Sequence, residues 1–288
     1  VLIGYDLLFP SELNILLNKK HINTFCFSER LHGYFWHPEN NIKNNFIYGD
    51  IELLLEKQKV TNFKKNFYFY GPPRHHQYFI NTKEKNLISQ IKKDLNFKTV
   101  CLILDWHSPI NLYDSSRSFS NNWRNNSIFY HEVINISKLF PKILFLIKNK
   151  DFNLDKIDYF SKILSTINNS SNIIFIKHKS ILNNPYYALD ISNFVVGLPT
   201  SLLDESIFLK KPTLIFDQFK LMEHHKIYND NLLIKNSYDF KKKIDFIFKN
   251  KKKHMINQNK VREKMFKNLK IKNNNKYIIK EILNQNKN

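Results

Sequence analysis

Apolar residues along most of the chain gather in short continuous runs, separated by longer stretches in which they recur at helical spacing. Runs of four to six mostly apolar residues, bounded by turn residues, are typical of strands that are buried on both faces of a sheet. We expect such strands at residues 1–5, 24–27, 45–48, 66–70, 99–104, 143–147, 172–176, 193–196 and 212–216. The stretches between them predict helices at residues 10–19, 51–58, 82–96, 127–139, 154–167 and 200–211.

Strands that alternate with helices of this length predict parallel sheets with helices on both faces. The expected fold is therefore α/β, with two Rossmann-like domains and a cleft between the carboxyl ends of their strands. We expect the first domain at residues 1–81, a connecting helix at 82–97, the second domain at 98–240 and a basic helical tail at 241–288. Because Val1 already lies in an expected strand, the first domain is expected to be partial.

The composition is that of a folded protein with enough apolar residues for two domains. Of its 288 residues, 42% are hydrophobic and 15% are aromatic, and no apolar run approaches the ~18 residues of a membrane-spanning helix. Cys26 and Cys101 lie in apolar runs, and no signal-peptide pattern opens the chain. Both features indicate a reducing compartment, so we expect a cytoplasmic protein.

The formal net charge of +20 is concentrated near the end of the chain. Residues 241–288 hold 15 lysines and one arginine against three acidic residues, which gives 16 − 3 = +13. Their apolar residues recur at roughly helical spacing, and basic amphipathic helices favour an anionic membrane surface. We therefore expect a possible peripheral location at the inner face of the cell membrane. The alternative is that the tail packs its apolar face on the first domain and that its lysines reflect a chain generally rich in Lys, Asn, Ile and Phe.

Specific nucleic-acid binding is not expected. The sequence contains no zinc-finger spacing, no RNA-recognition signature and no helix-turn-helix pattern. Most of the positive charge also lies in the last sixth of the chain, and the remainder is much closer to neutral.

Segment 190–217 carries the strongest functional pattern in the chain. A buried strand runs into a Gly-Leu-Pro turn at Gly197, and a helix then opens on Thr200 and Ser201. Unpaired N–H groups, the positive end of a helix dipole and two hydroxyls together suit a phosphate group. Glu205 lies one turn into this helix, within reach of a ribose hydroxyl. The alternative interpretation makes Thr200 a simple N-cap and Glu205 a solvated helix residue.

Polar side chains follow the carboxyl ends of six expected strands, where ligands of parallel sheets bind. They are His32 beside Gly33, Arg74, Asp105 with His107, Lys148 with Lys150, His178, and Thr200 with Ser201. Cationic groups that converge with a helix N-terminus suit a ligand that carries phosphate. A histidine from the opposite domain is a candidate general base. Each residue also has a simpler interpretation, as a polar turn, a turn cap or a solvated strand end.

A metal site is not expected, because no pair of histidines or carboxylates shows a spacing typical of metal ligands. Five motifs instead follow one another in a recognisable order. They are ERLHG at 29–33, YGD at 48–50, GPPRHHQY at 71–78, FLIKNKD at 145–151 and segment 190–217. This succession resembles the GT-B-fold transferases that build bacterial surface polysaccharides, especially the capsule, lipopolysaccharide and teichoic-acid transferases that use CMP- or CDP-linked donors. Each motif alone is degenerate, and the specificity lies in their order along nearly the whole chain.

The resemblance implies an acceptor-side first domain and a nucleotide-donor-binding second domain. His32 would be the base that faces the cleft, with Asp105 the other catalytic candidate. The donor-binding candidates are Lys148, Lys150, His178, Thr200, Ser201 and Glu205, and Gly33, Arg74, His107 and Gly197 are further cleft candidates. Relatives often carry Lys-Pro-His-Pro where this chain has Lys-Asn-Lys at 148–150. This departure leaves the donor nucleotide open, with His178 a possible substitute for the missing histidine.

The hypothesis is a transferase that moves a sugar, or a polyol phosphate, from a nucleotide-activated donor to a cell-surface polysaccharide or lipid-linked acceptor. It would need no metal and no cofactor besides the donor. A sugar-nucleotide epimerase of the same architecture is the first alternative. A non-catalytic protein that binds membranes or polyanions through its basic tail is the second.

Overall fold

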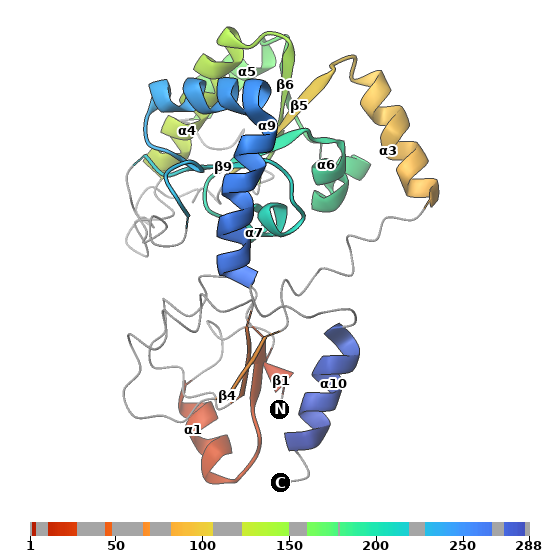
Figure 1. Ribbon diagram of the computed structural model, residues 1–288, viewed down its shortest axis with the longest axis vertical. Helices are drawn as coiled ribbons and strands as arrows, with labels where there is room; N and C mark the ends of the chain where they lie inside the picture. Colours follow the sequence, from red (N-terminus) through yellow and green to blue (C-terminus); the bar gives the residue numbers. More distant parts are fainter. Residues whose placement is uncertain are drawn as a thin grey trace. The chain divides into compact units, whose positions relative to one another are not determined.

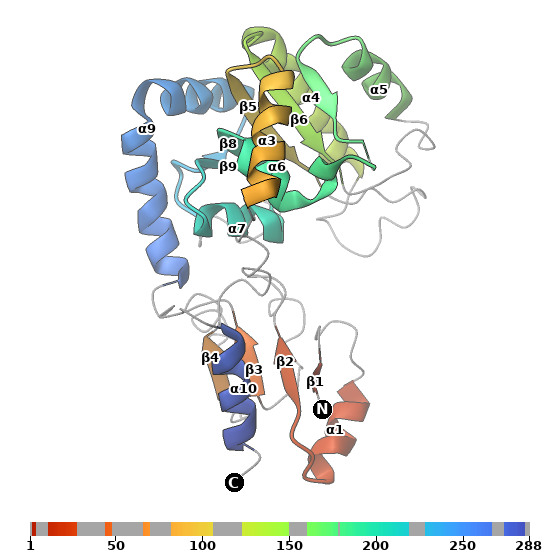
Figure 2. The ribbon, with the colours of Figure 1, turned by 90° about the vertical axis from the view of Figure 1, so that its right-hand side faces the viewer.

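The computed structural model describes residues 2–3, 11–27, 44–47, 66–69, 82–105, 123–149, 160–177, 179–218, 228–266 and 274–285. The chain forms two compact units, one made of Val1–Tyr78 with Arg262–Asn288 and the other of Phe79–Val261. Each unit combines parallel strands with helices (Figures 1 and 2), so the expected α/β class is confirmed. The helix expected at 51–58 lies outside the described residues.

The unit Phe79–Val261 is built on a six-stranded parallel sheet with the strand order β10-β9-β8-β5-β6-β7. The strands are β5 (Thr99–Leu104), β6 (Ile143–Lys148), β7 (Ile173–Phe175), β8 (Phe194–Gly197), β9 (Thr213–Phe216) and β10 (Leu233–Ile234). From β5 the chain runs outward through β6 to β7, and it then returns to the other side of β5 to form β8. The direction of winding therefore reverses between β5 and β8, which makes this the topological switch point of the sheet.

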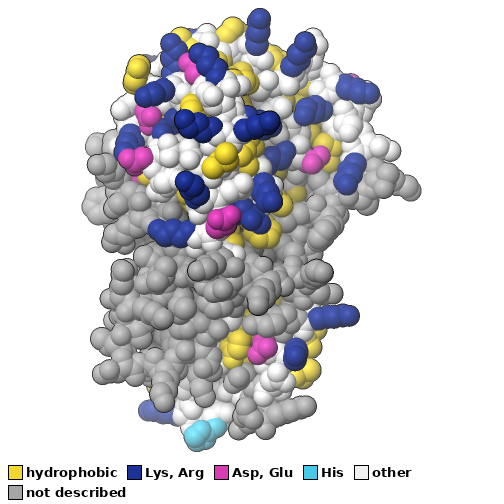
Figure 3. All heavy atoms as spheres, in the orientation of Figure 1, with side chains coloured by type: hydrophobic (Ala, Val, Ile, Leu, Met, Phe, Trp, Pro, Cys, Tyr) yellow, Lys and Arg dark blue, Asp and Glu magenta, His cyan; other side chains and the backbone are white. Residues whose placement is uncertain are grey.

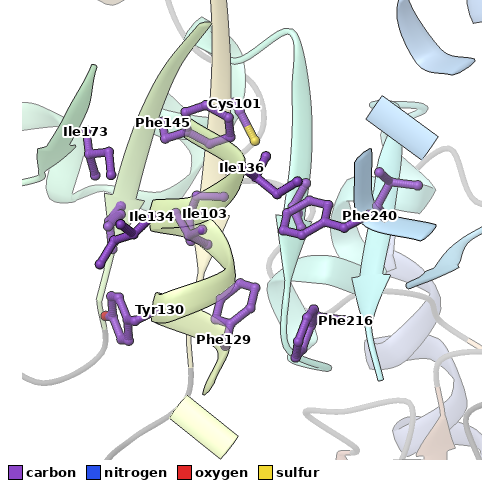
Figure 4. Packing of buried hydrophobic residues seen from close by; sticks show 14 of the residues in the cluster. Cys101, Ile103, Phe129, Tyr130, Ile134, Ile136, Phe145, Ile173, Phe216 and Phe240 are labelled. Atoms are coloured by element: carbon purple, nitrogen blue, oxygen red, sulfur yellow. The ribbon is translucent and has the colours of Figure 1, made fainter. Parts of the chain in front are cut away.

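One face of this sheet is covered by α4 (Trp123–Leu139), α5 (Ser161–Asn168) and the first half of α9 (Ser237–Phe266). Side chains from these helices and from the strands form one buried cluster (Figure 4). Phe129 of α4 lies 5.0 Å from Phe216 of β9, and Tyr130 meets Phe160 edge-on at 5.3 Å between ring centroids. Aromatic pairs of this geometry contribute about 0.5–1.5 kcal/mol each beyond the area that they bury.

The opposite face carries α3 (Thr82–Asp94), α6 (Pro185–Ile191) and α7 (Ser201–Phe208) (Figure 2). α6 contacts α3 and β5, and α7 contacts β8 and β9. Because helices cover both faces, the strands are buried on both sides, which is why they appear in the sequence as continuous apolar runs.

The apolar pattern did not predict α6 or β10, which are only seven and two residues long. The start of α6 is nevertheless encoded locally. The side chain of Asn184 accepts a hydrogen bond from the Tyr186 N–H at 3.0 Å, and Pro185 occupies the first helical position, where its missing N–H costs nothing. Short elements of this kind leave too few residues for a periodicity to be visible.

The other unit contains a four-stranded parallel sheet with the strand order β1-β2-β3-β4. Its elements are β1 (Leu2–Ile3), α1 (Ser11–Lys19), β2 (Phe25–Phe27), β3 (Asn44–Ile47), β4 (Asn66–Phe69) and α10 (Asn274–Gln285). Phe25 and Phe46 are buried at its centre, where Tyr68 packs against them. The C-terminal helix α10 completes this core, because its Ile278 and Ile282 pack on the same two phenylalanines.

Several apolar residues of the expected basic tail pack inside the protein. Ile244 and Ile247 of α9 belong to the core of Phe79–Val261, while Ile278 and Ile282 of α10 pack in the other unit. The alternative, in which the end of the chain packs on the first domain, describes α10 correctly. None of the helices in the described residues is long and apolar enough to span a membrane.

Gly197 lies at a close approach of two strands of the larger sheet. It pairs with Leu104 across the switch point, where the Leu198 N–H donates to the Leu104 carbonyl at 3.0 Å. A Cβ atom at position 197 would lie 2.7 Å from the Leu104 Cβ and 2.8 Å from the Leu104 carbonyl oxygen. Glycine is required here by the close approach of two backbones.

Gly197→Ala is expected to lower the free energy of unfolding by about 1–3 kcal/mol, the usual cost of forcing extra atoms into a packed core. Urea unfolding followed by circular dichroism would measure this change. An unchanged midpoint with an unchanged slope would show that β5 and β8 can separate without cost.

Candidate functional site

The candidate site lies at the carboxyl edge of the larger sheet, around the switch point between β5 and β8. Asp105 follows β5, Lys148 ends β6, and the turn after Gly197 leads from β8 into α7. The register pairs Leu104 with both Lys148 and Gly197, so these three strand ends lie next to one another. Open parallel sheets bind their ligands at such a point.

Thr200 is the N-cap of α7, as the simpler interpretation predicted. Its backbone is extended, with φ −137° and ψ 160°, and its hydroxyl oxygen accepts a hydrogen bond from the Leu203 N–H at 3.3 Å. This contact uses one lone pair of the oxygen, and the hydroxyl proton remains able to donate. Capping and phosphate binding are therefore compatible at Thr200. Ser201, the first residue of the helix, is half-buried beside it.

The carboxylate of Glu205 is enclosed by protein. Its side chain is fully buried, and it accepts a hydrogen bond at 3.0 Å from the hydroxyl of Tyr186 in α6. The interpretation of Glu205 as a solvated helix residue is wrong, because the residue has no exposed surface. A ribose hydroxyl would reach this carboxylate only after α6 and α7 moved apart, so the predicted ribose contact stays a prediction.

The neighbouring Asp204 is a second buried carboxyl group that the sequence analysis missed. The Tyr228 hydroxyl donates to its Oδ1, whereas Oδ2 has no hydrogen-bond partner. Burial raises the pKa of Asp204, the Tyr228 hydrogen bond opposes this shift, and the negative charge of Glu205 adds to it, so that the pKa is about 8. Asp204 is therefore largely protonated at neutral pH. The signal in the sequence was an acidic pair set directly among Leu202, Leu203 and Ile207.

A polar network joins the ends of β5 and β6. Asp105 is buried and accepts a hydrogen bond from the Tyr130 hydroxyl at 2.6 Å. Lys148 donates from Nζ to the side-chain oxygen of Asn183 at 3.1 Å, within the short 3-10 helix η8 (Ile181–Asn183). Burial lowers the pKa of Lys148, and the negative charge of Asp105 opposes that shift.

This network holds the ammonium group of Lys148 at the carboxyl edge of the sheet, and the negative charge of Asp105 partly balances its positive charge. Asp105 does not simply cap a turn, because it binds α4 through Tyr130 and acts electrostatically on Lys148. Nor is Lys148 a solvated strand end, since its side chain is more than half buried and bound to Asn183. A partly desolvated cation interacts with a phosphate more strongly than an exposed one does.

Half of the predicted site residues lie outside the described residues. These are His32, Gly33, Arg74, His107, Lys150 and His178. The structure brings together Asp105, Lys148 and Gly197 with the N-terminus of α7. No cluster of three or more His, Cys, Asp or Glu side chains that could hold a metal ion occurs in the part of the chain that the structure describes.

No family model and no curated protein sequence matches this chain. Solved structures do match it over nearly its whole length. UDP-GlcNAc 2-epimerase from Neisseria meningitidis, bound to UDP-GlcNAc, is similar with a TM-score of 0.60 at 14% identity, covering 99% of this chain and 75% of its own. The N-terminal domain of trehalose-6-phosphate phosphatase from Candida albicans gives 0.60 at 10% identity, covering 98% and 69%. Anabaena HepE, in complex with UDP and glucose, gives 0.57 at 8% identity, covering 94% and 74%.

The fold is GT-B-like. At identities of 8–14% these similarities establish the architecture alone. They agree with the two α/β units of the chain. What the site of this GT-B-like protein binds must be argued from its own residues.

Asp204 makes the stability of the protein depend on pH. Its folded-state pKa of about 8 lies above the ordinary value of 3.8, so the folded protein keeps a proton that the unfolded chain releases between these values. The stability associated with this carboxyl is therefore fully present below pH ~4 and is lost as the pH rises towards 8, by at most ~1.4 kcal/mol per pH unit.

Asp204→Asn should remove that loss, because the amide oxygen still accepts from Tyr228 and the side chain no longer ionises. Urea unfolding at acidic, neutral and mildly basic pH should show that the free energy of unfolding of the variant increases relative to that of the native protein as the pH rises. Asp94→Asn, at an exposed position whose hydrogen bond from Gln90 an asparagine can keep, serves as the matched control. Parallel pH profiles for the native protein and Asp204→Asn would contradict the assignment.

Proposed function

We propose that this protein is a GT-B transferase that moves a sugar, or a polyol phosphate, from a nucleotide-activated donor to a cell-surface polysaccharide or lipid-linked acceptor. The observation that carries the proposal is that the capped N-terminus of α7 and the half-buried Lys148 lie at or just after the ends of the strands on either side of β5, at one edge of the sheet, beside the β5–β8 switch point. A helix N-terminus and a partly desolvated cation suit the phosphate of a nucleotide.

In this proposal the donor phosphate lies against the first turn of α7. The N–H groups of that turn and the hydroxyls of Thr200 and Ser201 donate hydrogen bonds to its oxygens. Lys148 faces the negative charge that grows on the leaving phosphate as the bond to the transferred unit breaks. Such preorganised charge stabilises the transition state more than the ground state.

In this proposal Asp105 stabilises the charged form of Lys148. A carboxylate near the ammonium group favours its charged form, and the Tyr130 hydroxyl holds that carboxylate in place. His32 remains the predicted general base that would take the proton of the acceptor hydroxyl.

The similar solved structures include complexes with UDP, with UDP and glucose, and with UDP-GlcNAc. They support a nucleotide-sugar as the donor, and they make UDP the first nucleotide to test beside CMP, CDP and GDP. A bound nucleotide should raise the melting temperature of the protein, because ligands that bind the folded state stabilise it by mass action.

An epimerase is the second candidate, favoured by the similarity to UDP-GlcNAc 2-epimerase over 99% of this chain. Product analysis separates the two activities. An epimerase converts its nucleotide-sugar without any acceptor, whereas a transferase releases nucleotide in step with transfer to a glycan. Binding of no nucleotide at all would instead favour the non-catalytic, polyanion-binding alternative.

Lys148→Met is expected to weaken nucleotide binding by about 1–3 kcal/mol, the usual contribution of a hydrogen bond to a charged group. Methionine keeps much of the side-chain volume and removes the charge. Isothermal titration with the nucleotide found in the melting screen would measure the change, with the exposed Lys162→Met on α5 as the matched control. Equal affinities for the native protein and a folded Lys148→Met variant would remove Lys148 from the donor site.

His32→Ala is expected to lower turnover by a factor of about 100 or more, as for loss of a general base, while nucleotide affinity stays nearly unchanged. Steady-state kinetics with donor and acceptor, alongside titration of the nucleotide, would measure both quantities. A parallel loss of affinity and turnover would place His32 in the donor site or in a structural role.

A further inference from the structure

Helix α9 bends sharply in its middle. Asn250 has φ −138° and ψ 43°, values that are not helical, so the chain turns between two helical segments (Figure 2). The first segment is held by Phe240, Ile244 and Ile247, which are buried in the core of the larger unit. Phe248, directly before the bend, stacks edge-on against Phe194 with 5.8 Å between ring centroids.

The second segment is anchored to the amino end of β9. The Gln258 side chain accepts from the Thr213 N–H at 2.8 Å and donates to the Lys211 carbonyl at 2.5 Å. His254 lies beside it and is 1% exposed. Burial lowers the pKa of His254 to about 4, so this side chain is neutral at physiological pH. Buried side chains thus fix both helical segments, and they hold the exposed surface of the bend in place.

That outer surface is continuous and basic. All six residues from Phe248 to Lys253 are exposed, and Ile256 follows on the second segment with 59% of its surface exposed. Four of the six are lysines, and residues 246–262 include no aspartate or glutamate. We call Phe248, Lys249, Lys251, Lys252, Lys253 and Ile256 the bend patch.

Two lysines outside α9, Lys92 and Lys211, add positive charge near the bend patch. Lys92 of α3 and Lys251 both act electrostatically on Lys211, whose pKa is lowered to about 8, chiefly by burial. The Lys211 ammonium is held by the carbonyls of Asp190 and Ser192, at 3.1 and 2.7 Å. Lysine side chains gather over this unit, with hydrophobic surface between them (Figure 3).

We propose that the bend patch binds the surface of an anionic lipid bilayer. Four lysines without a nearby acid in the sequence attract anionic head groups, and Phe248, 47% exposed, and Ile256 add apolar surface among them. These side chains lie within eight residues of one another on both sides of the bend at Asn250, so charge and apolar surface come from one short exposed segment. A polyanion such as nucleic acid would use the charges but would gain little from the two apolar side chains.

Membrane contact through the bend patch differs from the contact through amphipathic helices that the sequence predicted. Helices lying in the interface would need the apolar faces of residues 241–288, and much of those faces packs inside the protein. The bend patch uses only residues that the fold leaves exposed. It does not depend on the transferase activity, since vesicle binding needs neither donor nor acceptor.

The test is co-sedimentation of the full chain with vesicles of phosphatidylcholine alone or mixed with phosphatidylglycerol, at low and raised salt. The first variant replaces Lys249, Lys251, Lys252 and Lys253 with glutamine. Its matched control replaces the exposed Lys138, Lys142, Lys162 and Lys179 with glutamine, which removes the same charge elsewhere. Ile256→Ser tests the apolar contribution. Circular dichroism and melting temperature establish that each variant is folded.

The native protein should sediment with the anionic vesicles only, and less so at raised salt, because the Debye length is ~8 Å at physiological ionic strength. The bend-patch variant should partition about tenfold more weakly or worse, the matched control should stay close to native, and Ile256→Ser should weaken binding measurably. No sedimentation of the native protein, or equal losses in both lysine variants, would overturn the proposal. So would an unchanged Ile256→Ser together with tighter binding to heparin, which would identify a polyanion surface.

Discussion

The close approach of β5 and β8 is the constraint on which the site of this protein depends. At the switch point the backbone of Gly197 lies so near Leu104 that a single Cβ atom would meet it at 2.7 Å. This contact places the end of β8 beside the end of β5, and it starts α7 from the same edge that carries Asp105 and Lys148. A wider spacing would move the helix N-terminus away from the ammonium group, and the proposed phosphate site would lose one of its two sides.

Buried polar groups hold the elements around this edge in position. Tyr130 ties α4 to Asp105, Tyr186 ties α6 to Glu205, and Tyr228 binds Asp204. In each case a tyrosine supplies apolar area together with one hydroxyl donor for a carboxyl group, which lowers the cost of burying that group. The site is therefore supported from several directions by short polar contacts within a hydrophobic surround.

The positive charge of the chain serves two structurally different purposes. Lys148 and Lys211 are partly buried and bound to side-chain or backbone oxygens, so they belong to the folded framework. The lysines at the bend of α9 are exposed, and their charge is available to a partner. The arrangement of α9 explains this difference, because Phe240, Ile244, Ile247 and Gln258 are buried in the larger unit, while the lysines at the bend are exposed.

The sequence by itself determined the α/β class, the position of most strands and the strand-turn-helix order of segment 190–217, because apolar runs and turn residues act over a few neighbouring positions. It did not predict α6 or β10, which are too short to show a period, and it left open whether Glu205 is solvated. Only the tertiary structure decided that Glu205 and Asp204 are buried, that Asp105 and Lys148 act on each other, and which apolar residues of the basic C-terminal helices pack inside. These outcomes depend on side chains brought together from distant parts of the chain, as Tyr186 and Tyr228 are around α7. No local pattern in the sequence records such contacts.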